Sequence, residues 1–197
     1  MPLRRSQKIV LAAFVLGSGL LGLSVFRGSS GSACRLVPYN QSATTTAPVP
    51  AQLPEWSLKG IDGQTHDLQA LAGDLTIIAF WATWCPNCHR ELATLRELHE
   101  ELSPAGLSII GISLDGAKRE DQVVRYAAEA ELPFPVVYTD RSDHAEMSAI
   151  RAVPTLLIYD AEGQLVGHFE GQTDKADLLE LAQSHLAPGS VAVLSRR

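Results

Sequence analysis

The chain has 197 residues, of which 46% are hydrophobic and 19% are charged, a composition typical of one globular domain with attached segments. Four of its 16 basic residues precede residue 28, so 12 basic residues stand against 22 acidic ones in the remainder, a net charge of −10. A surface this acidic repels phosphate backbones and argues against nucleic acid as a partner.

The first 27 residues carry an export pattern. An uncharged apolar run extends from Ile9 to Phe26, and as a helix it is about 27 Å long, close to the hydrocarbon core of a bilayer. Three basic residues precede it: Arg4, Arg5 and Lys8. The positive-inside rule then keeps the N-terminus cytoplasmic and places the rest outside the cytoplasmic membrane, in the periplasm or its equivalent. Residues 1–27 are therefore predicted to be a signal anchor, or a signal peptide cleaved after Ala33.

Residues 28–54 are rich in Ser, Thr, Ala and Pro and are predicted to form a flexible tether. Cys34 lies in this segment, where lipidation, an intermolecular disulfide and an ordinary linker thiol are all open. Residues 55–187 are predicted to form the folded domain, and residues 188–197 a loose tail.

Within the domain, apolar runs of strand length alternate with helical patterns. Strands are predicted at residues 56–58, 65–68, 75–80, 107–114, 136–138, 155–159 and 164–169. Helices are predicted from Pro86 through the apolar stripe Leu92, Leu95, Leu98 and Leu102, and at residues 120–131, 143–150 and 174–186. This order, closing with a hairpin and a helix, predicts an α/β fold: a thioredoxin-like mixed β-sheet flanked by helices on both faces.

Cys85 and Cys88 form a C-x-x-C pair at the predicted start of a helix, with Pro86 in its first turn. Unpaired N–H groups and the helix dipole stabilise a thiolate at that terminus, so Cys85 is predicted to be the attacking nucleophile. Cys88 lies on the same stripe as Leu92 and is expected to point inward. It would resolve mixed disulfides made by Cys85, so that the two cysteines cycle through a Cys85–Cys88 disulfide.

Three further positions complete the predicted site. Glu91 lies one helical turn after Cys88 and is expected to exchange a proton with its thiol, although a solvated glutamate that favours the helix dipole is the alternative. A cis Val153–Pro154 bond would bring a backbone edge next to the sulfurs, where an extended substrate could pair. Trp84, beside the nucleophile, is the third expected substrate contact.

Three stretches, Phe80-Trp-Ala-Thr-Trp-Cys-Pro-Asn-Cys88, Val153-Pro-Thr155 and Gly60-Ile-Asp-Gly63, resemble the extracytoplasmic thioredoxin-like proteins TlpA, ResA and CcmG. The resemblance spans residues 53–186. It implies a membrane-tethered thioredoxin domain that reduces disulfides in exported proteins, often apocytochrome c, with electrons from a transmembrane thiol carrier. A glutamate three residues after the second cysteine is common in that family and matches Glu91. Unlike ordinary thioredoxins, the chain has Ala79 in place of a buried aspartate, and Pro86-Asn87 between the cysteines.

Other functions share parts of this pattern. C-x-x-C followed by His89 is the attachment signature of c-type haem, with Met147 or a histidine as second axial ligand. The two cysteines and His89 could also hold copper in a periplasmic chaperone. A peroxidase of the same superfamily would have threonine three residues before its reactive cysteine, whereas Thr83 is two before Cys85. The main prediction is a thiol–disulfide oxidoreductase without cofactor or metal, acting as a reductase, with an oxidant or isomerase as the alternative.

Overall fold

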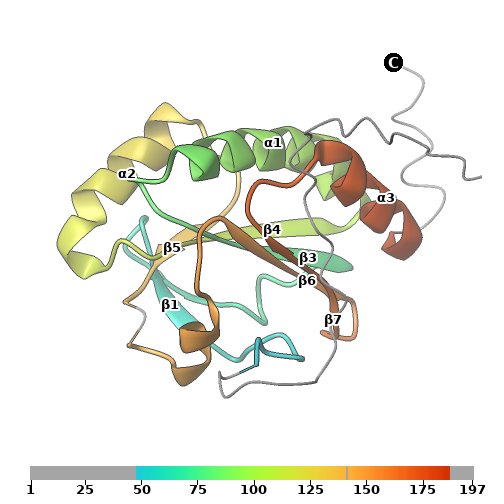
Figure 1. Ribbon diagram of the computed structural model, residues 1–197, viewed down its shortest axis with the longest axis horizontal. Helices are drawn as coiled ribbons and strands as arrows, with labels where there is room; N and C mark the ends of the chain where they lie inside the picture. The colour runs from blue at the N-terminus through green and yellow to red at the C-terminus, as the bar shows by residue number, and fades with distance from the viewer. Residues whose placement is uncertain (1–47, 141, 187–197) are drawn as a thin grey trace, which may run out of the picture. The chain divides into compact units, whose positions relative to one another are not determined.

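The computed structural model describes residues 48–140 and 142–186, which lie in one compact unit (Figure 1). Its strands are β1 (Ser57–Gly60), β2 (Thr65–Asp67), β3 (Leu75–Trp81), β4 (Leu107–Ser113), β5 (Val136–Tyr138), β6 (Thr155–Asp160) and β7 (Leu165–Glu170). The α-helices are α1 (Pro86–Leu102), α2 (Glu120–Glu129) and α3 (Lys175–His185). Short 3-10 helices are η1 (Ser103–Ala105), η2 (Ala117–Arg119) and η3 (Ala145–Ala149).

All seven strands join one mixed sheet in the order β2-β1-β5-β4-β3-β6-β7. The central strands β3, β4 and β5 are parallel, and β3 pairs with β6 in antiparallel register. Every residue of β3 is buried, as expected for a strand covered on both faces. Since β3 and β4 run in parallel, the segments that follow them emerge at the same edge of the sheet.

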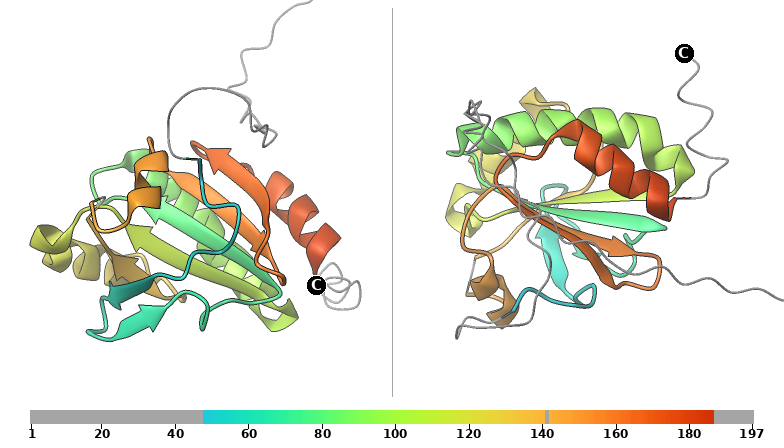
Figure 2. Two further views of the ribbon diagram at one scale, coloured as in Figure 1. Left: turned by 90° about the horizontal axis from the view of Figure 1, so that it is seen from below. Right: turned by 45° about the vertical axis from the view of Figure 1, so that its right-hand side comes forward.

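The alternation of side chains along β3 separates two hydrophobic layers. Ile77 and Trp81 pack with buried side chains of α1, α2 and α3, whereas Ile78 and Phe80 pack on the opposite face. That opposite face is covered by apolar residues that precede β1, by Leu68 after β2 and by η3 (Figure 1, Figure 2). The predicted thioredoxin-like mixed sheet flanked by helices on both faces is confirmed, because the three α-helices pack on one face and the 3-10 helix η3 packs on the other.

The packed part of the chain starts earlier than the predicted boundary at Glu55. Val49 and Leu53 are buried against the second layer, and Gln52 forms an antiparallel bridge with Gln164. The Tyr159 hydroxyl donates to the Pro50 carbonyl oxygen at 3.0 Å. The end of the predicted tether 28–54 therefore packs with the domain, because its few apolar side chains cover an edge of the core. The composition of this segment alone does not reveal that contact.

Two predicted helices differ in detail. Helix α2 ends at Glu129, because Glu131 adopts a left-handed φ of 50° and ends the helical path. The helix predicted at residues 143–150 is the shorter 3-10 helix η3.

The predicted membrane segment 1–27, Cys34 and the tail 188–197 lie outside the described residues. Within the part of the chain that the structure describes, no helix has the length and apolar character needed to cross a bilayer.

Candidate active site

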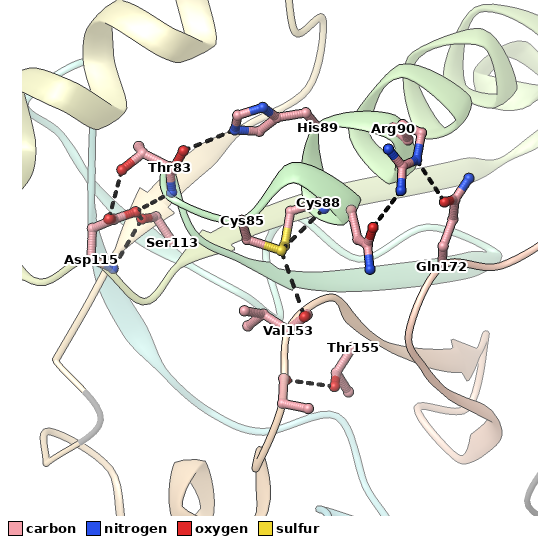
Figure 3. Close-up of a disulfide and its surroundings, with 12 residues drawn as sticks. Thr83, Cys85, Cys88, His89, Arg90, Ser113, Asp115, Val153, Thr155 and Gln172 are labelled. Atoms are coloured by element: carbon pink, nitrogen blue, oxygen red, sulfur yellow. Dashed lines mark hydrogen bonds between the residues drawn. A yellow bond between two sulfur atoms is a disulfide. The ribbon is translucent and has the colours of Figure 1, made fainter.

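Cys85 and Cys88 are joined by a disulfide, with their Cα atoms 5.3 Å apart (Figure 3). Cys85 is the N-cap residue of α1, and its sulfur accepts the backbone N–H of Cys88 at 3.1 Å. Pro86 takes the first helical position, where its missing N–H costs no hydrogen bond. The Cys88 N–H is shared between the Cys85 carbonyl oxygen, at 3.0 Å, and the Cys85 sulfur. This N–H and the positive end of the helix dipole at the first turn favour the thiolate of Cys85 over the thiol.

The two cysteines differ in access. Cys88 is fully buried and packs in the same hydrophobic layer as Leu92 and Leu95. Cys85 retains 5% of its surface, and its neighbour Trp84 is 60% exposed. An incoming sulfur can therefore approach only from the side of Cys85 and Trp84.

The Val153–Pro154 peptide bond is cis and lies directly against the couple. The Cys85 sulfur is 3.6 Å from the Val153 carbonyl oxygen, although the two residues are 68 positions apart (Figure 3). Val153 is half-buried and Pro154 is buried. The start of β6 thus places a backbone edge beside the sulfur that faces the surface.

Glu91 lies in the interior rather than in solvent. Its side chain is buried, and its Oε2 atom accepts the backbone N–H of Thr173 at 2.8 Å. Among the described residues, Oε1 has no hydrogen-bond partner. Burial raises the pKa of Glu91 from 4.5 to about 7, against the lowering effect of the Thr173 N–H. One turn after Cys88, the structure therefore holds a carboxyl group whose protonated and ionised forms are both populated near neutral pH.

The His89 ring points away from the sulfurs. Its Nε2 atom donates to the Thr83 carbonyl oxygen at 2.9 Å (Figure 3). The ring stacks on Tyr126, with the ring centroids 4.4 Å apart. Met147, the distal ligand that a haem would use, packs in the layer on the opposite face of the sheet. No cluster of three potential metal ligands occurs in residues 48–140 and 142–186. The direction of the His89 ring and the position of Met147 favour sulfur exchange over the haem and copper alternatives.

Asp115 is an acidic residue next to the site that the sequence prediction did not include, and its side chain is buried. Its carboxylate accepts both the backbone N–H and the hydroxyl of Thr83, each at 2.7 Å. The Thr83 hydroxyl is thereby committed to Asp115, which removes the role a peroxidase threonine would have. The sequence contains a pattern that could have identified Asp115, because an acidic residue that follows β4 lies at the sheet edge where α1 begins.

Comparisons with known proteins agree with this geometry. Residues 49–168 match the AhpC/TSA family. The thiol–disulfide oxidoreductase ResA of Oceanobacillus iheyensis is 30% identical over 139 residues, covering 68% of this chain and 71% of that protein. The thioredoxin-like protein YneN of Bacillus subtilis is 27% identical over 128 residues, covering 64% and 74%.

Solved structures show the same fold. A putative thiol:disulfide interchange protein DsbE from Chlorobium tepidum aligns with a TM-score of 0.62 at 18% identity, over 74% of this chain and 100% of that one. StoA from Bacillus subtilis aligns with a TM-score of 0.54 at 23% identity, over 66% and 98%.

Proposed function

Because the chain belongs to the AhpC/TSA family and is a thiol–disulfide oxidoreductase of the ResA type, we propose that it reduces disulfides in exported proteins, apocytochrome c among them. The observation that carries the proposal is the placement of Cys85 at the N-cap of α1, bonded to the shielded Cys88. An asymmetric pair of this kind has one sulfur that attacks and one that resolves.

In the reducing direction, the Cys85 thiolate attacks one sulfur of the client disulfide. A mixed disulfide forms, and the other client sulfur leaves as a thiolate that takes up a proton from water. Cys88 then attacks Cys85, which releases the second client thiol. Two electrons have passed to the client, and the protein is left with the Cys85–Cys88 disulfide seen in the structure.

Glu91 takes part in the second step. Cys88 attacks as a thiolate, so its proton must leave a site without solvent access. The ionised Glu91 carboxylate is a suitable acceptor because its pKa of about 7 lies close to that of a thiol. The proton then passes from Glu91 to solvent or to the departing client thiolate.

A client would bind in an extended form against the start of β6. The backbone of Val153 offers an edge for pairing next to the reacting sulfur, and the exposed Trp84 offers apolar area on the other side. Contacts of this kind are independent of sequence, which suits an enzyme that acts on several clients.

The proposed location is the outer side of the cytoplasmic membrane, with residues 9–26 as a single span. The basic start and the uncharged run support it. A reductase outside the membrane needs reducing equivalents from inside, where thiols are kept reduced, so a transmembrane thiol carrier is the proposed electron donor.

Equilibration of the full-length protein with glutathione buffers tests the direction of electron flow. A reductase gives a reduction potential well below that of the glutathione pool, whereas a value near about −120 mV is that of a thiol oxidant and would refute the proposal. Reduction of an oxidised apocytochrome c peptide by the prereduced protein then tests the client, with Cys85→Ala as the inactive control.

A further inference from the structure

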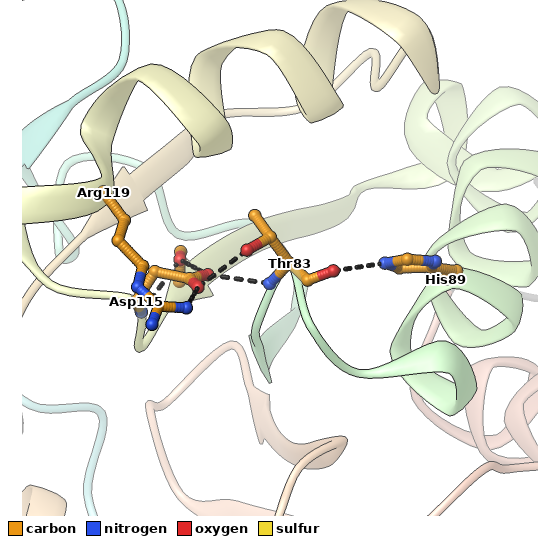
Figure 4. A network of polar contacts seen from close by, with 5 residues as sticks. Thr83, His89, Asp115 and Arg119 are labelled. Carbon is orange, nitrogen blue, oxygen red and sulfur yellow. Dashed lines mark hydrogen bonds and ion pairs between the residues drawn. The ribbon is translucent and has the colours of Figure 1, made fainter.

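The Asp115 side chain is buried, and its carboxylate accepts three hydrogen bonds from described residues. Its side chain has no exposed surface, and besides Thr83 it accepts the Ser113 hydroxyl at 2.8 Å. Arg119 is the nearest cation, at 4.0 Å (Figure 4). A buried carboxylate costs free energy unless it is fully hydrogen-bonded, so this one is held in a single geometry.

Thr83 connects this carboxylate to helix α1. Its N–H and hydroxyl both go to Asp115, while its carbonyl oxygen accepts the His89 Nε2–H (Figure 4). The short loop between β3 and α1 is therefore held from β4 on one side and from the first turns of α1 on the other. Cys85 follows Thr83 by two residues, so the position of Thr83 determines where the nucleophile enters the helix.

The stabilisation of a thiolate at a helix N-terminus depends on that entry point, because it falls off within the first turn. In the structure the Cys85 sulfur is 3.1 Å from the Cys88 nitrogen, and a small shift of the loop would lengthen this contact. We propose that Asp115 is a positioning residue for the redox couple. By holding Thr83 it keeps the Cys85 sulfur at the N-terminus of α1, which stabilises the thiolate and sets the reduction potential.

The charge of Asp115 acts in the opposite direction. A negative carboxylate near the loop disfavours a second negative charge on Cys85, and Arg119 offsets only part of it. Loss of positioning destabilises the thiolate and lowers the potential, whereas loss of the charge alone stabilises the thiolate and raises the potential. The sign of the change therefore separates the two effects.

The test measures the equilibrium of the full-length protein with glutathione, the alkylation rate of Cys85 as a function of pH, and the thermal stability. Asp115→Asn removes the charge and part of the bonding. Thr83→Val keeps the charge and the branched shape but removes the hydroxyl bond, and Thr83→Ser restores that hydroxyl. Asp143→Asn is the matched control, because Asp143 also accepts a hydroxyl (Thr139, 2.8 Å) and a backbone N–H (Asp140, 2.9 Å), within its own loop.

If Asp115 positions the redox couple, the equilibrium constant for reduction of the protein by glutathione falls about threefold in Thr83→Val. It falls about tenfold in Asp115→Asn, which equals about 30 mV in reduction potential. The alkylation profile of Cys85 moves to higher pH in both. Thr83→Ser returns towards the wild-type values, and Asp143→Asn loses stability without a change in potential.

An unchanged or raised equilibrium constant in Thr83→Val would overturn the proposal, whatever Asp115→Asn does, since the valine variant retains the charge. If Asp115→Asn does not fold, Thr83→Val alone tests the positioning role. The inference rests on the proposed function of the redox couple. The glutathione titration of the wild-type protein distinguishes a failure of that function from a failure of the positioning role. A wild-type protein that does not equilibrate reversibly with glutathione refutes the function, whereas a normal wild-type protein with unaltered Thr83→Val refutes only the positioning role.

Discussion

Replacing Glu91 with glutamine should change how the stability of the protein depends on pH. The Glu91 carboxyl is buried, and its pKa rises from 4.5 to about 7 on folding. Between these values the folded protein holds a proton that the unfolded chain has released, so the free energy of unfolding falls as pH rises through this window. The full loss, reached above pH 7, is about 3 kcal/mol. Glutamine resembles the protonated carboxyl in shape and does not ionise, so the variant avoids this loss.

Urea unfolding of the oxidised protein, repeated from pH 4.5 to pH 8, measures the effect. The wild type and Glu91→Gln should be similar in stability at the acid end, and the variant should gain by about 3 kcal/mol at the alkaline end. His99 and His168, whose pKa values are lowered by burial, titrate in both proteins and cancel in the difference. Glu129→Gln, an exposed position of helix α2, should give a curve parallel to the wild type. If the Glu91→Gln curve is also parallel, the carboxyl does not titrate in this window and the reasoning fails.

Four other outcomes follow from the site. Cys88→Ala should accumulate a mixed disulfide with clients on non-reducing gels and Cys85→Ala should not; the reverse pattern would exchange their roles. Glu91→Gln should also flatten the pH–rate profile of client reduction around pH 7, and an unaltered profile would remove this residue from proton transfer. Trp84→Ala should lower kcat/KM for protein clients while unfolding stays within about 0.5 kcal/mol of wild type, so an unchanged kcat/KM would end its role in binding. Leu95→Ala, a fully buried truncation behind Cys88, should cost about 2–5 kcal/mol in urea unfolding, and a loss below 1 kcal/mol would contradict the packing.

Much of the fold could be predicted because its central strands are buried on both faces. Continuous apolar runs such as those of β3 and β4 leave few alternatives, and the leucine stripe of α1 has a clear helical period. The N-terminal boundary could not be placed in this way. Val49 and Leu53 are isolated large apolar residues in a stretch rich in proline and alanine, and their burial depends on an edge near Tyr159 that lies over a hundred residues later.

In the candidate site, too, some features follow from local sequence and others depend on contacts between distant residues. The cysteine pair and Pro86 form one local pattern, whose helical consequences follow from spacing alone. Glu91 could be placed one turn from Cys88, but its burial and its bond to Thr173 depend on a contact across 82 residues. Asp115 was missed for the same reason, because its bonds to Thr83 span 32 residues and no short motif records them.

The sequence C-x-x-C-H illustrates why such long-range contacts decide function. The same five positions can present two sulfurs and an imidazole to a metal, or two sulfurs to another disulfide. Here the His89 Nε2–H is used by the Thr83 carbonyl, and Thr83 is itself fixed by Asp115. With the imidazole directed elsewhere, the helix terminus and the Val153 carbonyl are the polar groups left around Cys85. The helix terminus favours the Cys85 thiolate, and the Val153 backbone offers an edge to an extended client, so the contacts that distinguish this redox couple from a metal site lie outside the motif.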